Sequence, residues 1–117
     1  MPLAERSLGD VVVVSVTGDL TATTGMGIQL RDRVRTLLQQ GHRHLLLDLA
    51  GTEHLDSTGL GELVHAFAST RNRGGALRLL HPTRRIRELL RITKLESVFE
   101  CHDNEDVAVA AFGAEQR

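Results

Sequence analysis

Apolar residues along the chain form two patterns, continuous runs and repeats spaced three and four positions apart. The runs predict buried strands, and the spaced repeats predict amphipathic helices. Predicted strands cover residues 11–16, 45–49, 76–80 and 98–101. Predicted helices cover residues 26–38, 60–68, 86–90 and 107–112. Residues 3–8 precede a turn signal at Gly9-Asp10 and are expected to pair with the first run as a hairpin.

Glycines and short polar residues mark the ends of the predicted helices. Gly41 follows the first helix, where a left-handed residue commonly ends a helix. Thr83 and Asn104 are placed to cap the third and fourth helices. The second helix has the most regular repeat, so its apolar face is expected to be buried. That face consists of Leu60, Leu63, Val64, Phe67 and Ala68.

The order of these elements predicts the fold class. Strands that alternate with helices over short links favour a mostly parallel or mixed sheet with right-handed crossovers. The chain has 117 residues, of which 41% are hydrophobic, enough for one compact core. No internal repeat or linker divides it. We therefore expect one α/β domain over residues 1–117, with about 4–5 strands in a mixed central sheet and about 4 helices.

Composition narrows the classes of function. The net charge is −1 and aromatic residues make up 3%, which does not favour binding to nucleic acid or to an anionic membrane. No run approaches the roughly 20 apolar residues of a membrane-spanning helix, and the first residues do not resemble a secretory signal. The single cysteine, Cys101, excludes an internal disulfide and is expected to be a buried small hydrophobe. The expected location is cytoplasmic.

Residues 48–61 combine the end of a buried strand, a loop and the start of a helix. Functional groups collect at the carboxyl ends of strands in open α/β sheets. Asp56 is a good N-cap, and Ser57 would then occupy the first helical position with its hydroxyl facing solvent. Gly59 and Gly61 keep this turn free of bulk, so another protein's active site could approach closely. The alternative interpretation is an ordinary helix start, which uses the same residue types.

The fold is expected to tolerate a phosphate on Ser57. The phosphate adds about −1.5 to −2 charges at a helix N-terminus, where the dipole and the free N–H groups favour an anion. A partner that fits a neutral hydroxyl beside Asp56 would instead meet added bulk and negative charge. Modification is therefore expected to switch binding rather than folding.

Several segments together resemble the STAS domain of anti-sigma factor antagonists. The strongest match is Leu55-Asp56-Ser57-Thr58-Gly59-Leu60-Gly61, which follows Asp48-Leu49-Ala50-Gly51. The valine strand, the Gly18-Asp19-Leu20 turn and residues 71–75, 79–82 and 84–99 also match. The resemblance covers nearly the whole chain and implies the STAS fold. It also implies a protein that binds an anti-sigma factor and thereby frees a sigma factor for transcription.

The same resemblance implies partners and site residues. The anti-sigma factor is typically a serine kinase that uses ATP to phosphorylate the antagonist, and a metal-dependent serine phosphatase resets the serine. Ser57 is then the phosphoacceptor, and Asp56 positions it. The implied partner-binding residues are Asp19, Thr21, Thr24, Asp56, Ser57, Thr58, Gly59 and Gly61. Thr21 stands where the family usually has an aspartate, which bears on phosphorylation and partner contacts, but it remains an adequate cap for the next helix.

Other polar residues are expected to face water. Basic residues in the second half should form a solvated helix face partly balanced by Glu88, and a docking patch for an acidic partner is the alternative. These basic residues are Arg71, Arg73, Arg78, Arg84, Arg85, Arg87, Arg91 and Lys94. His42 and His44 have no third ligand at a metal-binding spacing, so an exposed pair is expected.

The sequence carries no recognisable enzyme motif. It lacks a phosphate-binding loop, a dinucleotide-binding glycine pattern and a nucleophile elbow, and no feature places His54 as a base for Ser57. We expect a substrate of an enzyme, without a catalytic residue, cofactor or metal of its own. The alternatives are a scaffold subunit of a stressosome-like complex, a STAS subunit of an ABC lipid-transport system, and a nucleotide-binding module. Whether two copies form a homodimer stays open.

Overall fold

The computed structural model describes residues 2–114 as alternating strands and helices. The strands are β1 (Leu3–Leu8), β2 (Val11–Thr17), β3 (His44–Gly51), β4 (Ala76–Leu80) and β5 (Cys101–His102). The helices are α1 (Met26–Gln39), α2 (Ser57–Asn72), α3 (Arg84–Ile92) and α4 (Glu105–Ala114). The predicted α/β class and order of elements are confirmed. The ends of the expected domain, residue 1 and residues 115–117, lie outside the described residues.

The strands form one mixed sheet in the order β1-β2-β3-β4-β5. β1 runs antiparallel to β2, and the other neighbouring pairs are parallel. The turn between β1 and β2 contains Gly9, whose φ of 61° lies in the left-handed region that glycine adopts without strain. The predicted hairpin and the mixed sheet are therefore confirmed.

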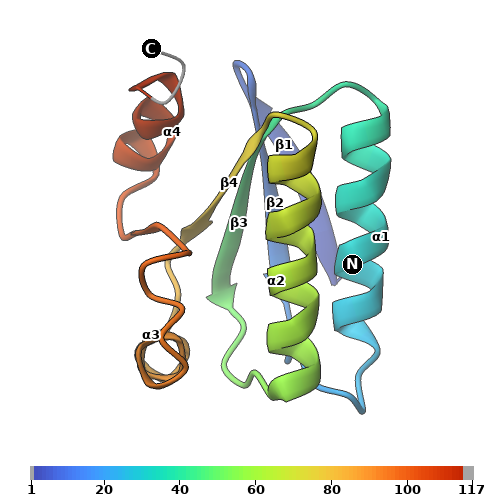
Figure 1. Ribbon diagram of the computed structural model, residues 1–117, viewed down its shortest axis with the longest axis vertical. Helices are drawn as coiled ribbons and strands as arrows, with labels where there is room; N and C mark the ends of the chain where they lie inside the picture. Colours follow the sequence, from blue (N-terminus) through green and yellow to red (C-terminus); the bar gives the residue numbers. More distant parts are fainter. Residues whose placement is uncertain (1, 115–117) are drawn as a thin grey trace.

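Helices cover both faces of the sheet (Figure 1), and each face has its own apolar cluster. α1 and α2 lie on one face, where Val12, Val14 and Leu47 belong to the larger cluster. α4 lies on the other face, where Val13 and Leu46 belong to the smaller one. Because successive strand residues point to opposite faces, a strand covered on both sides must be apolar throughout. This requirement explains the continuous runs in β2 and β3.

α3 lies at the end of the molecule where α1 and α2 begin and β3 ends (Figure 1). Thr83 caps it as predicted, since its hydroxyl accepts a hydrogen bond from the Ile86 N–H at 3.3 Å. Ile86 and Leu90 are buried in the larger cluster. Asn104 likewise caps α4 through the Val107 N–H, at 3.0 Å. The starts of α3 and α4 thus follow the capping chemistry of the sequence.

The last strand is shorter than the predicted 98–101. Val98 and Phe99 lie in a turn in which both N–H groups donate to the Leu95 carbonyl. Phe99 is buried because it packs edge-on against Phe67, with ring centroids 5.4 Å apart. Phe99 is therefore apolar because it packs in the core, and not because it pairs within a strand. Cys101, which begins β5, is half-buried against the same cluster, and burial raises the pKa of its thiol.

The buried face of α2 also differs from the predicted one. Leu63 is buried as expected, but Val64 and Ala68 are exposed. The helix instead buries Ala66 and Thr70, whose hydroxyl donates to the Ala66 carbonyl at 2.7 Å. Small residues can occupy this face because α2 packs closely beside α1 and the sheet.

Two residues that were expected to face water are buried beneath α4. Arg78, on β4, is 5% exposed, and its guanidinium lies 5.4 Å from the centre of the Phe112 ring. The ring of His44 stacks on the same phenyl ring, with centroids 5.3 Å apart. Arg78 Nη1 also lies 3.0 Å from His102 Nε2, which must accept because a guanidinium only donates. Burial, followed by the Arg78 charge, lowers the pKa of His102.

Candidate functional site

Two loops lie side by side where β2 and β3 end. Residues 18–25 follow β2, and residues 52–56 follow β3. Leu20 and Leu55 form an isolated parallel bridge between the loops. The Leu20 N–H donates to the His54 carbonyl at 2.9 Å, and the Leu20 carbonyl accepts from the Asp56 N–H at 3.2 Å. We call residues 18–25 and 52–58 together the two-loop surface.

Asp56 joins the two loops through hydrogen bonds to both oxygens of its carboxylate. Oδ1 accepts a hydrogen bond from the Gly59 N–H at 2.9 Å, so Asp56 is the N-cap of α2, as predicted. Oδ2 accepts from the Ala22 N–H of the other loop, also at 2.9 Å. The second bond joins residues 34 positions apart, and no local sequence pattern indicates it. One side chain therefore sets both the start of the helix and the position of the neighbouring loop.

Ser57 is the first residue of α2, and its side chain is exposed, as predicted. Within residues 2–114 its hydroxyl takes part in no hydrogen bond. Thr58, which follows it, is also exposed. The oxygen of Ser57 is therefore accessible to a reacting group from another protein, at a position where the helix N-terminus favours negative charge.

Asp19 and Thr24 shape the loop after β2. The Asp19 carboxylate accepts from the backbone N–H of His54 at 3.1 Å and lies 3.1 Å from His54 Nδ1. The Thr24 hydroxyl donates to the Asp19 carbonyl at 2.8 Å and accepts from the Met26 N–H at 3.2 Å. The structure brings both residues to the two-loop surface. In the folded chain, each holds the loop in place.

Thr21 does not cap α1, contrary to the prediction. The N-cap is Gly25, with a φ of 69° and no side chain of its own, and the Thr24 hydroxyl accepts the hydrogen bond from the first helical N–H, that of Met26. The Thr21 hydroxyl instead lies 3.2 Å from that of Thr23. The chain turns after Thr21, where the Thr24 N–H donates to the Thr21 carbonyl at 3.2 Å, and the helix begins at Met26, as predicted. Thr21 is half-buried beside Ala22, the residue that Asp56 contacts.

Gly59, which the resemblance implies is a partner-binding residue, is itself buried. A Cβ atom at this position would lie 1.9 Å from the Leu20 carbonyl oxygen. Glycine is therefore required so that the first turn of α2 can contact the loop after β2. Gly61, by contrast, is exposed with open space around its Cα, as expected.

The charge of Asp56 makes the two-loop surface sensitive to acid. Hydrogen bonds from the Ala22 and Gly59 N–H groups lower the pKa of this carboxyl below 3.8. Because the folded-state pKa is the lower one, the carboxylate stabilises the fold above the unfolded-state pKa, and this stabilisation is lost as the pH falls through the folded-state value. We expect the melting temperatures of the wild type and of Asp56→Asn to converge as the pH falls below about 4.

Thr83→Ala serves as the control for this pH dependence. It removes the N-cap of α3, which carries no charge, so its effect on melting temperature should not vary with pH in this way. A difference between wild type and Asp56→Asn that stays constant between neutral and acidic pH would contradict the role of the Asp56 charge.

Residues 2–114 also bear on metal binding and on membrane insertion. In this part of the chain, no three His, Cys, Asp or Glu side chains lie close enough to hold a metal ion. None of the helices in these residues combines the length and hydropathy needed to span a membrane.

A family model described as the STAS domain matches residues 3–108. The chain is 33% identical over 66 residues to a Thermotoga neapolitana protein named as an anti-sigma factor antagonist and homologue of TM1081; the match covers 56% of this chain and 58% of that protein. It is 34% identical over 71 residues to the anti-sigma-B factor antagonist of Bacillus subtilis, a match covering 61% of this chain and 64% of that one. The matched stretches thus span less than two thirds of either relative.

Solved structures show the same fold. The crystal structure of the Thermotoga maritima protein TM1081, also named as an anti-sigma factor antagonist, superposes with a TM-score of 0.86 at 22% identity and covers 94% of this chain and 93% of that one. The Bacillus cell fate determinant SpoIIAA in its phosphorylated form superposes with a TM-score of 0.71 at 18% identity, covering 93% and 98%. These likenesses establish the architecture.

Proposed function

This chain belongs to the STAS domain family, and from that membership we propose that it is an anti-sigma factor antagonist. It binds an anti-sigma factor that is also a serine kinase, and this binding releases a sigma factor for transcription. The kinase transfers phosphate from ATP to Ser57, and the modified antagonist leaves the complex. A metal-dependent serine phosphatase removes the phosphate and restores binding.

The observation that carries this proposal is the hydroxyl of Ser57, exposed and without a hydrogen bond within residues 2–114, at the start of α2. A kinase can reach this oxygen without unfolding the chain. The phosphate is compatible with the fold because it lies at the positive end of the α2 dipole. The structure solved in a phosphorylated form, which shares this architecture, is consistent with that tolerance.

The proposal makes this protein a binding module and a substrate, without a catalytic residue, cofactor or metal of its own. Its two-loop surface contacts another protein. Residues 1–117 form one STAS domain, and the protein acts in the cytoplasm. The net charge of −1 supports a protein partner rather than nucleic acid.

Incubation with the cognate anti-sigma factor kinase and ATP tests the proposal. We expect the wild type to gain the mass of one phosphate and the Ser57→Ala variant to gain none. Ser7→Ala is the matched control, because it removes an exposed hydroxyl on β1, outside the two-loop surface, and should leave phosphorylation unchanged. Intact-mass spectrometry measures all three.

Full phosphorylation of Ser57→Ala would show that the acceptor lies elsewhere. Elution of the purified protein as a large particle would favour the stressosome-like scaffold, and copurification with an ATPase would favour the lipid-transport subunit. Retention of nucleotide at micromolar concentration would favour the nucleotide-binding module.

A further inference from the structure

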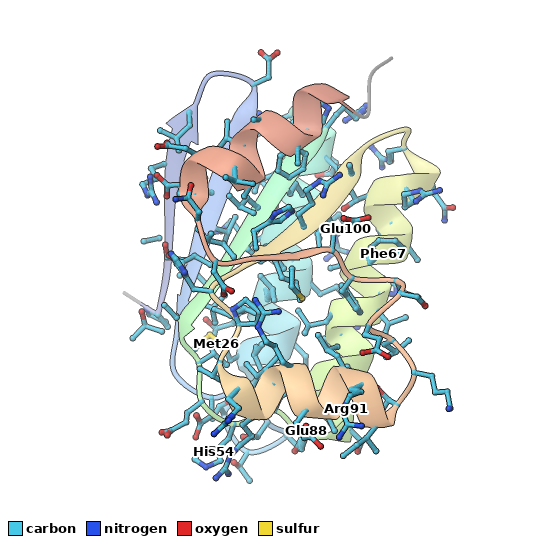
Figure 2. The ribbon with its side chains drawn as sticks, turned by 90° about the vertical axis from the view of Figure 1, so that its left-hand side faces the viewer. Met26, His54, Phe67, Glu88, Arg91 and Glu100 are labelled. Carbon is cyan, nitrogen blue, oxygen red and sulfur yellow. The ribbon has the colours of Figure 1, made fainter. Side chains whose placement is uncertain are left out.

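An open groove runs between the loop after β3 and one face of α3. Its volume is about 690 Å³, and it is lined by Glu53, Leu55, Thr83, Arg84, Arg85, Glu88, Leu89 and Ile92. Figure 2 shows Glu88 and Arg91 on α3 at the same end of the molecule as His54 of the loop. The groove therefore adjoins the two-loop surface. Leu55 belongs to both, since it bridges Leu20 and precedes Ser57 by two residues.

α3 has two apolar faces, and only one is covered. Ile86 and Leu90 are buried in the core. Leu89 is half-buried, and Ile92 is 64% exposed although it is a large aliphatic side chain. Residues 85, 88, 89 and 92 are spaced so that they share one side of a helix. This second face turns an apolar strip toward the groove, and within residues 2–114 neither Leu89 nor Ile92 belongs to a core cluster.

The charges on the rim indicate what covers the strip. Within residues 2–114, Arg84, Arg85 and, on the loop side of the groove, Glu53 form no ion pair, whereas Glu88 pairs with Arg91, so the α3 side of the rim is positive. Both unpaired arginines lie in the first turn of α3, where the positive end of the helix dipole makes cations unfavourable. They do not help the helix to form, and they present positive charge beside an apolar strip.

We infer that the groove binds an acidic, amphipathic segment of the partner kinase, in which an aliphatic side chain contacts Leu89 and Ile92 and carboxylates pair with Arg84 and Arg85. This inference rests on the proposed function, because the groove adjoins the serine that the kinase modifies. It adds a second contact to that of the two-loop surface. The kinase is thus held on the antagonist by α3 while its active site reaches Ser57.

Titration of the cognate kinase by calorimetry tests this assignment. Ile92→Ser and Arg85→Glu should each weaken binding by about tenfold or more, as expected for residues at the centre of a contact. Val107→Ser is the matched control for the first, because Val107 is 59% exposed on α4 at the other face of the sheet. Arg73→Glu is the control for the second, because Arg73 is exposed at the far end of α2. Both controls should bind like the wild type.

The outcomes separate this inference from the proposed function. If Ile92→Ser and Arg85→Glu bind like the wild type while Ser57→Asp binds weakly, the groove assignment is wrong and the proposed function stands. If no kinase binds the wild type, the proposed function fails, and the groove is tested with a synthetic amphipathic peptide of leucine and glutamate. Saturable NMR shifts at the amides of Leu55, Leu89 and Ile92 then support an acidic, amphipathic ligand, and their absence overturns it. A dimer that Ile92→Ser dissociates would assign the groove to a second copy instead.

Discussion

Gly59→Ala is expected to lower the free energy of unfolding by on the order of 3 kcal/mol. The added methyl would lie 1.9 Å from the Leu20 carbonyl oxygen and 2.8 Å from a methyl of Leu55. Relief requires the backbone of the loop after β2 to move, and that loop is held by the Asp56–Ala22 hydrogen bond. The substitution therefore separates the two loops. Urea unfolding followed by circular dichroism measures the change.

Gly61→Ala is the matched control, two residues further along the same helix. Apart from its chain neighbours and the backbone of its own helix, nothing in the described residues lies within 4 Å of the added methyl, and alanine is the better helix former. We expect a gain of about 0.5–1 kcal/mol. Equal stability of the two variants would show that the contact between Gly59 and Leu20 yields easily to a methyl group.

Phosphoserine at position 57 should weaken binding to the anti-sigma factor by more than tenfold, which is about 1.4 kcal/mol. The phosphate adds about −1.5 to −2 charges beside the Asp56 carboxylate, where the proposed partner would otherwise contact a neutral hydroxyl. The thermal unfolding midpoint should change little, because the first turn of α2 tolerates an anion. Calorimetric titration and thermal denaturation of the same phosphorylated sample measure the two effects.

Ser7→Asp is the control for added charge. Ser7 is exposed on β1, at one edge of the sheet, and a negative charge there should leave partner binding unchanged. Severe unfolding of the phosphorylated protein would contradict the compatibility of the helix start with an anion. Equal weakening by Ser7→Asp would show that net charge, rather than the position of the phosphate, controls binding.

The fold was predictable because its signals are local. A strand covered on both faces must be apolar throughout, and an amphipathic helix must repeat its apolar residues, so β2, β3 and α1 follow directly from the pattern. Errors arose where distant contacts decide the outcome. Phe99 is apolar because it meets Phe67, and Arg78 is buried because α4 covers β4. One sequence signal indicated that Arg78 is buried, namely its position within an apolar strand.

The same difference between local features and distant contacts decides how much of the candidate site was predictable. Asp56 caps α2, and Ser57 is exposed, because both features depend on a helix start that a few adjacent residues define. The link to Ala22 and the close approach at Gly59 depend on a loop more than thirty residues earlier in the chain. The groove beside α3 has one signal in the sequence. Leu89 and Ile92 are apolar and lie on the same side of the helix as Arg85.

The surroundings of Ser57 come from two segments that the whole of α1 and β3 separate along the chain. A nascent or misfolded copy, or a linear peptide around the serine, lacks the Leu20–Leu55 bridge and the Asp56–Ala22 clasp. Under the proposed function, a kinase that contacts both loops would therefore not recognise such copies. The proposed switch would respond to the concentration of folded antagonist rather than to the total amount synthesised.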